Sequence, residues 1–227
     1  MAERFVVRVA LGSPVIVSSY YTLDSLLAAI VFDATKDLHQ AHEQLPLLRT
    51  SGVWHASQAF IELNETPHTG STVLTASLRA MHDVDAKDVS PDRRGIIPRV
   101  GLSREREWGN IQNAYETIDA AALWWFGEGD SEAVERLMDG VWALGKKRTS
   151  GFGRVTGIDF DVAKVDGVMD SSSLPMRPVP LSQWVGSADA LKADCAWRPA
   201  YWDPLNRAVC VVPFEQRLAR TVIEGWL

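Results

Sequence analysis

Hydrophobic patterning over the first 165 residues switches between two periods, and this switching restricts the fold more than any other feature of the sequence. Apolar residues that alternate with polar ones predict strands, whereas apolar residues three and four apart predict helices. The patterns predict a strand, a helix, two strands, a helix and a strand. They span residues 5–17, 23–42, 53–63, 114–126, 131–144 and 154–165. This order is typical of an α+β, ferredoxin-like (RRM-like) fold, in which an antiparallel sheet carries two helices on one face.

Two segments lie outside this series of elements. Residues 84–112 have no sustained period and mix prolines and glycines with cations. A stretch of about 30 residues without its own helix or strand is usually functional or disordered. Residues 166–227 begin with a serine- and proline-rich stretch and contain four tryptophans. We therefore expect a main domain over residues 1–165, interrupted by an insertion at 84–112, and a C-terminal extension over 166–227 that packs on it.

Composition narrows the class of protein. Hydrophobic residues make up 46% of the chain, which suffices for a buried core, and the net charge of −6 argues against a protein that coats nucleic acid non-specifically. The two cysteines form no CxxC pair, the histidines form no HxH or HExxH motif, and no apolar run is long enough to cross a membrane. We expect a cytoplasmic protein with no cofactor, no metal and no membrane contact.

A basic, glycine-spaced stretch, GKKRTSGFGRV at residues 145–155, follows the second predicted helix. Gly145 is placed to act as the helix C-cap, and the two lysines after it would lie at the negative end of the helix dipole. Gly151 and Gly153 lack side chains, so a phosphate could lie against their backbone N–H groups. The stretch lacks the order of a Walker A loop. A structural turn and a phosphate-binding loop both remain open readings.

The helical pattern over residues 131–144 also predicts which side chains of that helix are buried. Val134, Leu137, Met138, Val141 and Trp142 would form one buried stripe on the helix. On the strand 114–126, the adjacent Trp124 and Trp125 would face opposite sides of the sheet.

The chain resembles a known group of proteins at several of these stretches. The glycine-rich stretch and its place after the second helix resemble the repeat-associated (RAMP) superfamily of CRISPR proteins, whose thumb occupies the position of residues 84–112. The segments LDSLLAAIVFD and VWHASQAFIE resemble the type IV CRISPR effector subunit of the Cas-five class. The resemblance covers most of residues 5–160. It implies a non-catalytic subunit that caps the 5′ handle of a guide RNA, beside CRISPR backbone subunits and a large-subunit-like protein.

The resemblance also implies which residues contact RNA. Cations would bind phosphates, and Phe152 would stack on a base. Tyr20 and His55 are further candidates. The other expected RNA-binding residues are Lys146, Lys147, Arg148, Ser150, Gly151, Gly153 and Arg154 in the glycine loop, and Arg93, Arg94, Arg99, Arg104 and Arg106 in the insertion. The arginines of the insertion could equally be solvated partners of neighbouring acids. Contact with the flanking motif of target DNA is left open.

Two other functions compete with this one. A metal-independent endoribonuclease that processes the guide would need a general base and a general acid. The candidates are His55, Tyr20, Tyr21, Lys146, His39 and His42, and they suggest no clear acid–base pair, so we expect no catalysis. The second alternative is a protein-only interaction module that works through its tryptophan-rich C-terminal residues.

Overall fold

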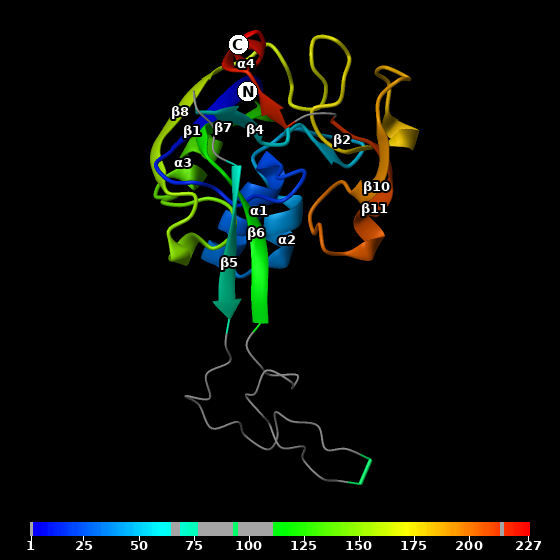
Figure 1. Cartoon of the computed structure of the whole chain (residues 1–227). Coiled ribbons are helices and arrows are strands. Elements are labelled where there is room, and N and C mark those ends of the chain that lie inside the picture. Colours follow the sequence, from blue (N-terminus) through cyan, green and yellow to red (C-terminus); the bar gives the residue numbers. More distant parts are fainter. Residues whose placement is uncertain (1, 65–68, 77–92, 95–110, 214–215) are drawn as a thin grey trace. The chain divides into compact units, whose positions relative to one another are not determined.

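The computed structural model describes residues 2–64, 69–76, 93–94, 111–213 and 216–227 (Figure 1). These residues belong to two compact units. The larger unit contains Met1–His68 and Ile118–Leu227, and the smaller one contains Thr69–Thr117. None of the helices in the described ranges combines the length and the apolar character that crossing a lipid bilayer requires.

A five-stranded mixed sheet organises the larger unit. Its strand order is β12-β4-β7-β1-β8, in which β12 and β4 run parallel and every other neighbouring pair runs antiparallel. The strands are β1 (Glu3–Leu11), β4 (Phe60–Leu63), β7 (Ala120–Gly129), β8 (Val155–Val162) and β12 (Arg217–Leu218). The alternating patterns predicted strands at the positions of β1, β4, β7 and β8, and strands are found there. The single strand predicted over 53–63 is wrong in its extent, because only Val53–Trp54 and Phe60–Leu63 form strands. The parallel edge strand β12 comes from the predicted extension and was not foreseen.

The described part of the chain has four α-helices: α1 (Leu23–Thr35), α2 (Leu38–Glu43), α3 (Ser131–Met138) and α4 (Arg220–Glu224). Leu27 of α1 and Val134 of α3 pack with Trp125 in the core on one face of the sheet. The opposite face buries Trp124 with Ile223 of α4. The prediction that the two adjacent tryptophans face opposite sides is confirmed, and both faces of the sheet are covered.

The single helix predicted over residues 23–42 is wrong in one respect, because the chain forms two helices there. Lys36 adopts a left-handed conformation with φ of 58° and ends α1. The Asp37 carboxylate then accepts the backbone N–H groups of His39 and Gln40 and caps α2. The apolar period runs across this break, so periodicity alone could not locate it.

The helix predicted over residues 131–144 ends six residues early, at Met138. Its N-cap is Asp130, whose side chain accepts the N–H of Ala133. Gly140, with φ of 80°, turns the chain just after the helix. Trp142 is consequently not part of a buried stripe and is 60% exposed.

Short elements complete the larger unit. The pattern over 53–63 contains β3 (Val53–Trp54), which pairs with β2 (Arg49–Thr50), and then β4. A three-stranded sheet of order β10-β11-β9 lies in the C-terminal part, with β9 (Val179–Pro180), β10 (Lys192–Ala196) and β11 (Arg207–Val211).

A buried ion pair joins the C-terminal part to α1. The Arg177 guanidinium and the Asp24 carboxylate are both inaccessible to solvent, and they approach to 3.3 Å at two pairs of atoms. Arg177 also donates to the carbonyl oxygens of Trp54 (2.7 Å) and Trp197 (2.6 Å) and to the Tyr201 hydroxyl (3.0 Å). Burial acts to lower the pKa of Arg177, but Asp24 and Tyr201 outweigh it and raise that pKa. The guanidinium therefore stays charged in the interior.

The smaller unit contains β5 (Thr69–Ala76) and most of β6 (Ile111–Ile118), which form a two-stranded sheet. The strand predicted over 114–126 is thus divided between β6 and β7, with Asp119 between them. Most of the predicted insertion 84–112 lies outside the described residues.

Candidate functional site

The glycine loop, which we define as residues 145–154, is shaped by its contacts with the segment that follows β1. Gly145 and Gly153 have positive φ angles of 76° and 65°. A Cβ on Gly145 would lie 2.4 Å from the carbonyl oxygen of Ile16, and one on Gly153 would lie 2.0 Å from that of Leu144. The predicted role of Gly145 as the cap of the preceding helix is wrong, because α3 has already ended. Close backbone packing is what requires glycine here.

Two backbone N–H groups expected to receive a phosphate are already engaged. The N–H of Gly151 donates to Arg148 O at 3.0 Å and closes the short 3₁₀ helix Arg148–Ser150. The N–H of Gly153 donates to Pro14 O at 2.8 Å. These bonds hold the loop in place and use the N–H groups against which a phosphate could have lain. An anion at this loop therefore cannot be bound by the N–H groups of Gly151 and Gly153.

The loop presents its cations outward. Lys146, Arg148 and Arg154 are exposed, as is Ser150, whereas Lys147 and Phe152 are half-buried. Three of the predicted RNA-binding side chains therefore carry positive charge directly into solvent along one short loop.

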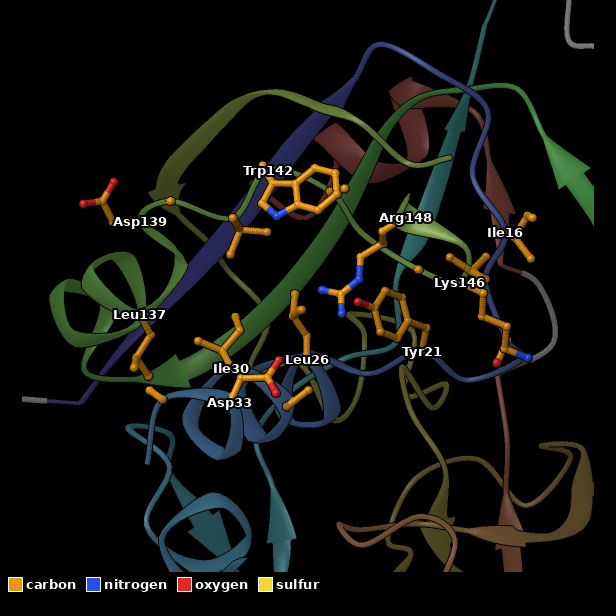
Figure 2. Close-up of a pocket in the computed structure, with 18 residues that line it drawn as sticks. Ile16, Tyr21, Leu26, Ile30, Asp33, Leu137, Asp139, Trp142, Lys146 and Arg148 are labelled. Carbon is orange, nitrogen blue, oxygen red and sulfur yellow. The ribbon is translucent and has the colours of Figure 1, made fainter. Parts of the chain in front are cut away.

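A pocket of about 480 Å³ opens beside this loop (Figure 2). Leu26 and Ile30 of α1 and Leu137 of α3 give it apolar walls. Figure 2 shows Lys146 and Arg148 at the end where Tyr21 lies, and Asp139 at the opposite end. The other lining residues are Ile16, Val17, Ser18, Ala29, Asp33, Ala34, Gly140, Val141, Trp142, Ala143 and Gly145.

Tyr21, rather than its neighbour Tyr20, belongs to this pocket. Its ring meets that of Trp125 edge-on at 5.6 Å. Burial raises the pKa of Tyr21 to about 12, although a backbone hydrogen bond from Gly145 and the nearby Arg148 charge act to lower it. Tyr21 therefore keeps a neutral hydroxyl beside two cations over the whole physiological range.

Tyr20 lies elsewhere in the larger unit. It packs against the apolar cluster of Cys195, Cys210 and Val212. Burial, followed by the two nearby thiols, raises the pKa of Tyr20. It is not among the residues that line the pocket beside the glycine loop.

The other predicted contacts are not brought together with the loop in the part of the chain that is described. His55 is half-buried, and its Nε2 lies 2.9 Å from Thr50 Oγ1. Arg93 and Arg94 are exposed and belong to the smaller unit. Arg99, Arg104 and Arg106 lie outside the described residues.

Sequence reasoning missed Trp142 as a functional candidate, because the apolar period of 131–144 assigned it to the core. The Asp139-Gly140 pair, which ends the helix, was the available signal. Tyr21 was a candidate for catalysis, for bracing the first helix and for stacking on RNA, but it was not in the predicted RNA-binding set. No local pattern separates it from Tyr20.

A mixed sheet covered on both faces, with a cationic loop beside an apolar pocket, defines an α+β protein with a candidate ligand site between α1 and the segment that joins α3 to β8. Over residues 5–213 the chain matches the family described as CRISPR type IV associated protein Csf3, and it belongs to that family. This confirms the resemblance to a type IV CRISPR effector subunit of the Cas-five class and implies other CRISPR subunits as partners. A comparison with curated proteins finds no match.

Proposed function

We propose that this chain is the non-catalytic RNA-binding subunit of a type IV CRISPR ribonucleoprotein and that it caps the 5′ handle of the guide RNA with its glycine loop. Membership of the Csf3 family supports a place in such a complex. RNA binding is supported above all by one observation: two exposed cations, Lys146 and Arg148, line the same pocket as the exposed Trp142. Single-stranded RNA is bound by this combination, because cations neutralise phosphates and aromatic rings stack on unpaired bases.

The dimensions of the pocket fit this role. A volume of about 480 Å³ lies within the range of about 300–1,000 Å³ that is usual for small-molecule sites. The apolar walls suit the faces of a base. Asp33 and Asp139 would accept hydrogen bonds from its amino groups rather than meet a phosphate. The pocket would thus accommodate one unpaired nucleotide, with its phosphate at the end formed by Lys146 and Arg148.

We also assign the larger unit to the ferredoxin-like class. The order β4-β7-β1-β8, antiparallel throughout, supports this assignment, as do α1 between β1 and β4 and α3 between β7 and β8. Residues 69–117 fall between β4 and β7 in the sequence, which is the position of a thumb in the superfamily that the chain resembles. Contact with target DNA, through the insertion or through residues 166–180, stays open, because most residues of the insertion lie outside the described ranges.

The absence of catalysis is part of the proposal, and two observations support it. Tyr21, with a pKa of about 12, cannot accept a proton near neutral pH. His55 is not among the residues that line the pocket, and its Nε2 is engaged with Thr50. His55 and the cations of the glycine loop are thus not positioned to act on the same phosphodiester bond of an RNA.

The test uses the whole complex. The chain is co-expressed with its neighbouring CRISPR subunits and a CRISPR array, and the RNA that copurifies is sequenced. We expect a uniform guide whose 5′ handle is protected. Rebinding of this guide to RNA-free complex is then measured at several salt concentrations for wild type and for Lys146→Ala/Arg148→Ala. If each cation neutralises one phosphate, the slope of log affinity against log salt falls by about 1.4 in magnitude.

The matched control is Lys192→Ala/Arg207→Ala, which removes one lysine and one arginine from exposed positions on β10 and β11. It should leave both the affinity and the salt slope unchanged. Trp142→Ala should weaken binding by about 1–3 kcal/mol through lost stacking. Wild-type binding by the loop variant, or an equal loss in the control, would contradict the proposal.

A further inference from the structure

Three side chains that are distant in sequence converge on the larger unit, away from the pocket. His55 follows β3, Glu128 lies near the end of β7, and Asp166 follows β8. The Nδ1 atom of His55 lies 3.6 Å from Glu128 Oε2 and 3.7 Å from Asp166 Oδ2, and the three atoms lie within 4.8 Å of one another. All three side chains are half-buried.

The histidine ring is held with one nitrogen facing the two carboxylates. Its Nε2 lies 2.9 Å from Thr50 Oγ1, which can fix the proton on that nitrogen. The Nδ1 atom is inaccessible to solvent and has no hydrogen-bond partner within the described ranges. Its distances to the carboxylates exceed the usual hydrogen-bond length of about 2.7–3.2 Å. Buried nitrogen atoms without a partner are rare, and with the proton on Nε2 the Nδ1 atom offers a lone pair that a ligand would satisfy.

The backbone positions the Asp166 carboxylate directly, and it also holds the main chain of Glu128 in place. Asp166 Oδ1 accepts two N–H groups of the turn that follows it, at 2.8 and 3.1 Å, which leaves Oδ2 toward His55. The N–H of Glu128 donates to His55 O at 3.1 Å, and its carbonyl accepts from Leu48 at 2.7 Å. The three ligand atoms are therefore presented by fixed segments rather than by a mobile surface.

We propose that His55, Glu128 and Asp166 bind one divalent transition-metal ion, and that this ion is Zn²⁺. One imidazole nitrogen and two carboxylates are ligands that Zn²⁺ accepts, and their two negative charges match its charge. In a tetrahedral site, bonds of about 2.0–2.2 Å place neighbouring ligand atoms roughly 3.3–3.6 Å apart, close to the two distances from His55 Nδ1 to the carboxylates. Water completes the coordination. The ion joins three segments that the sequence separates, and so it stabilises the fold.

The Arg4 guanidinium competes with this ion for the Glu128 carboxylate. Its Nε lies 3.3 Å from Glu128 Oε2, and its Nη1 donates to Lys164 O at 2.8 Å. The side chain is about half exposed and can move aside. Removing this positive charge should strengthen the binding of a cation, by up to about fivefold. A cluster that is only structural would not respond in this way.

The site lies at the opposite end of the sheet from the glycine loop. In the β-ladders, Arg4 faces Glu128 at the start of β1, whereas Leu11 faces Val155 at its end. At about 3.3 Å per residue, the two ends are roughly 25 Å apart. Loss of metal and loss of RNA binding can therefore be measured independently.

The test is a calorimetric titration of the chelator-treated full-length chain with ZnCl₂, and with MnCl₂ for comparison, alongside thermal melts. We expect one equivalent of Zn²⁺ to bind, more tightly than Mn²⁺, and to raise the melting temperature. His55→Gln and Asp166→Asn should each weaken binding at least about tenfold. The control His39→Gln removes an exposed histidine and should change nothing.

The wild-type titration decides the proposal even if a ligand variant fails to fold. Zinc binding by wild type that is weaker than about 100 µM would overturn it, because such a site would be largely empty at ordinary concentrations. Tight binding that the two ligand variants leave intact would overturn it too. In Arg4→Gln, which keeps all three ligands, stronger zinc binding supports the proposal and unchanged or weaker binding counts against it.

Discussion

Two glycines of the loop provide a matched pair for testing how its shape is fixed. Gly151 and Gly153 both have positive φ angles, 91° and 65°. A Cβ on Gly151 would meet no atom within 4 Å, whereas one on Gly153 would lie 2.0 Å from the carbonyl oxygen of Leu144. The two substitutions to alanine therefore share the cost of a left-handed conformation and differ in the backbone clash.

The magnitudes follow from this difference. The left-handed conformation costs an alanine about 1–2 kcal/mol, which is the whole effect expected for Gly151→Ala. In Gly153→Ala, Leu144 must also move, which breaks the 2.8 Å hydrogen bond from its N–H to Gly153 O. That loss adds about 0.5–1.5 kcal/mol, and the displaced backbone brings the total to about 3 kcal/mol or more.

Thermal melts followed by circular dichroism measure both variants. For a chain of this size, 1 kcal/mol lowers the melting temperature by about 2–4 °C. We expect a fall of about 2–8 °C for Gly151→Ala and of about 6–12 °C for Gly153→Ala. Equal falls in the two variants, or a Gly153→Ala protein as stable as wild type, would refute the view that backbone packing fixes the loop.

Two further predictions concern stability and pH. Arg177→Met should lower the free energy of unfolding by about 3–5 kcal/mol in urea melts, because it leaves Asp24 buried and uncompensated. The exposed control Arg220→Met should leave that free energy nearly unchanged. An Arg177→Met protein as stable as wild type would contradict this reasoning. The hydrogen bond from Arg49 holds the pKa of Glu43 below its usual range, so folding favours the ionised form. That stabilisation is present above the usual pKa of about 4.3 and is lost as the pH falls through the lowered value. The melting temperatures of Glu43→Gln and wild type should differ at neutral pH and converge in acid. A difference that persists below about pH 3 would exclude this cause.

Local sequence pattern determined the kinds of element and much of their order. Alternation identified β1, β4, β7 and β8, the three- and four-residue spacing identified α1 and α3, and the same rules placed Trp124 and Trp125 on opposite faces. The glycine loop was recognised as a turn rich in cations, and Lys146, Arg148 and Arg154 are exposed there. These features depend on neighbours along the chain, so the sequence displays them directly.

The tertiary structure alone decided where the elements end and which side chains meet. The apolar period continues past Met138, but the turn at Gly140 ends α3 and exposes Trp142 beside the pocket. The Asp24–Arg177 pair, like the cluster of His55 with its two carboxylates, joins residues separated by whole elements. The period of apolar residues indicates which side of an element is buried. It contains no information about residues that come into contact only after the chain has reversed direction. For the same reason, the sequence left open a phosphate site at the backbone N–H groups of Gly151 and Gly153, which the folded chain uses for its own packing.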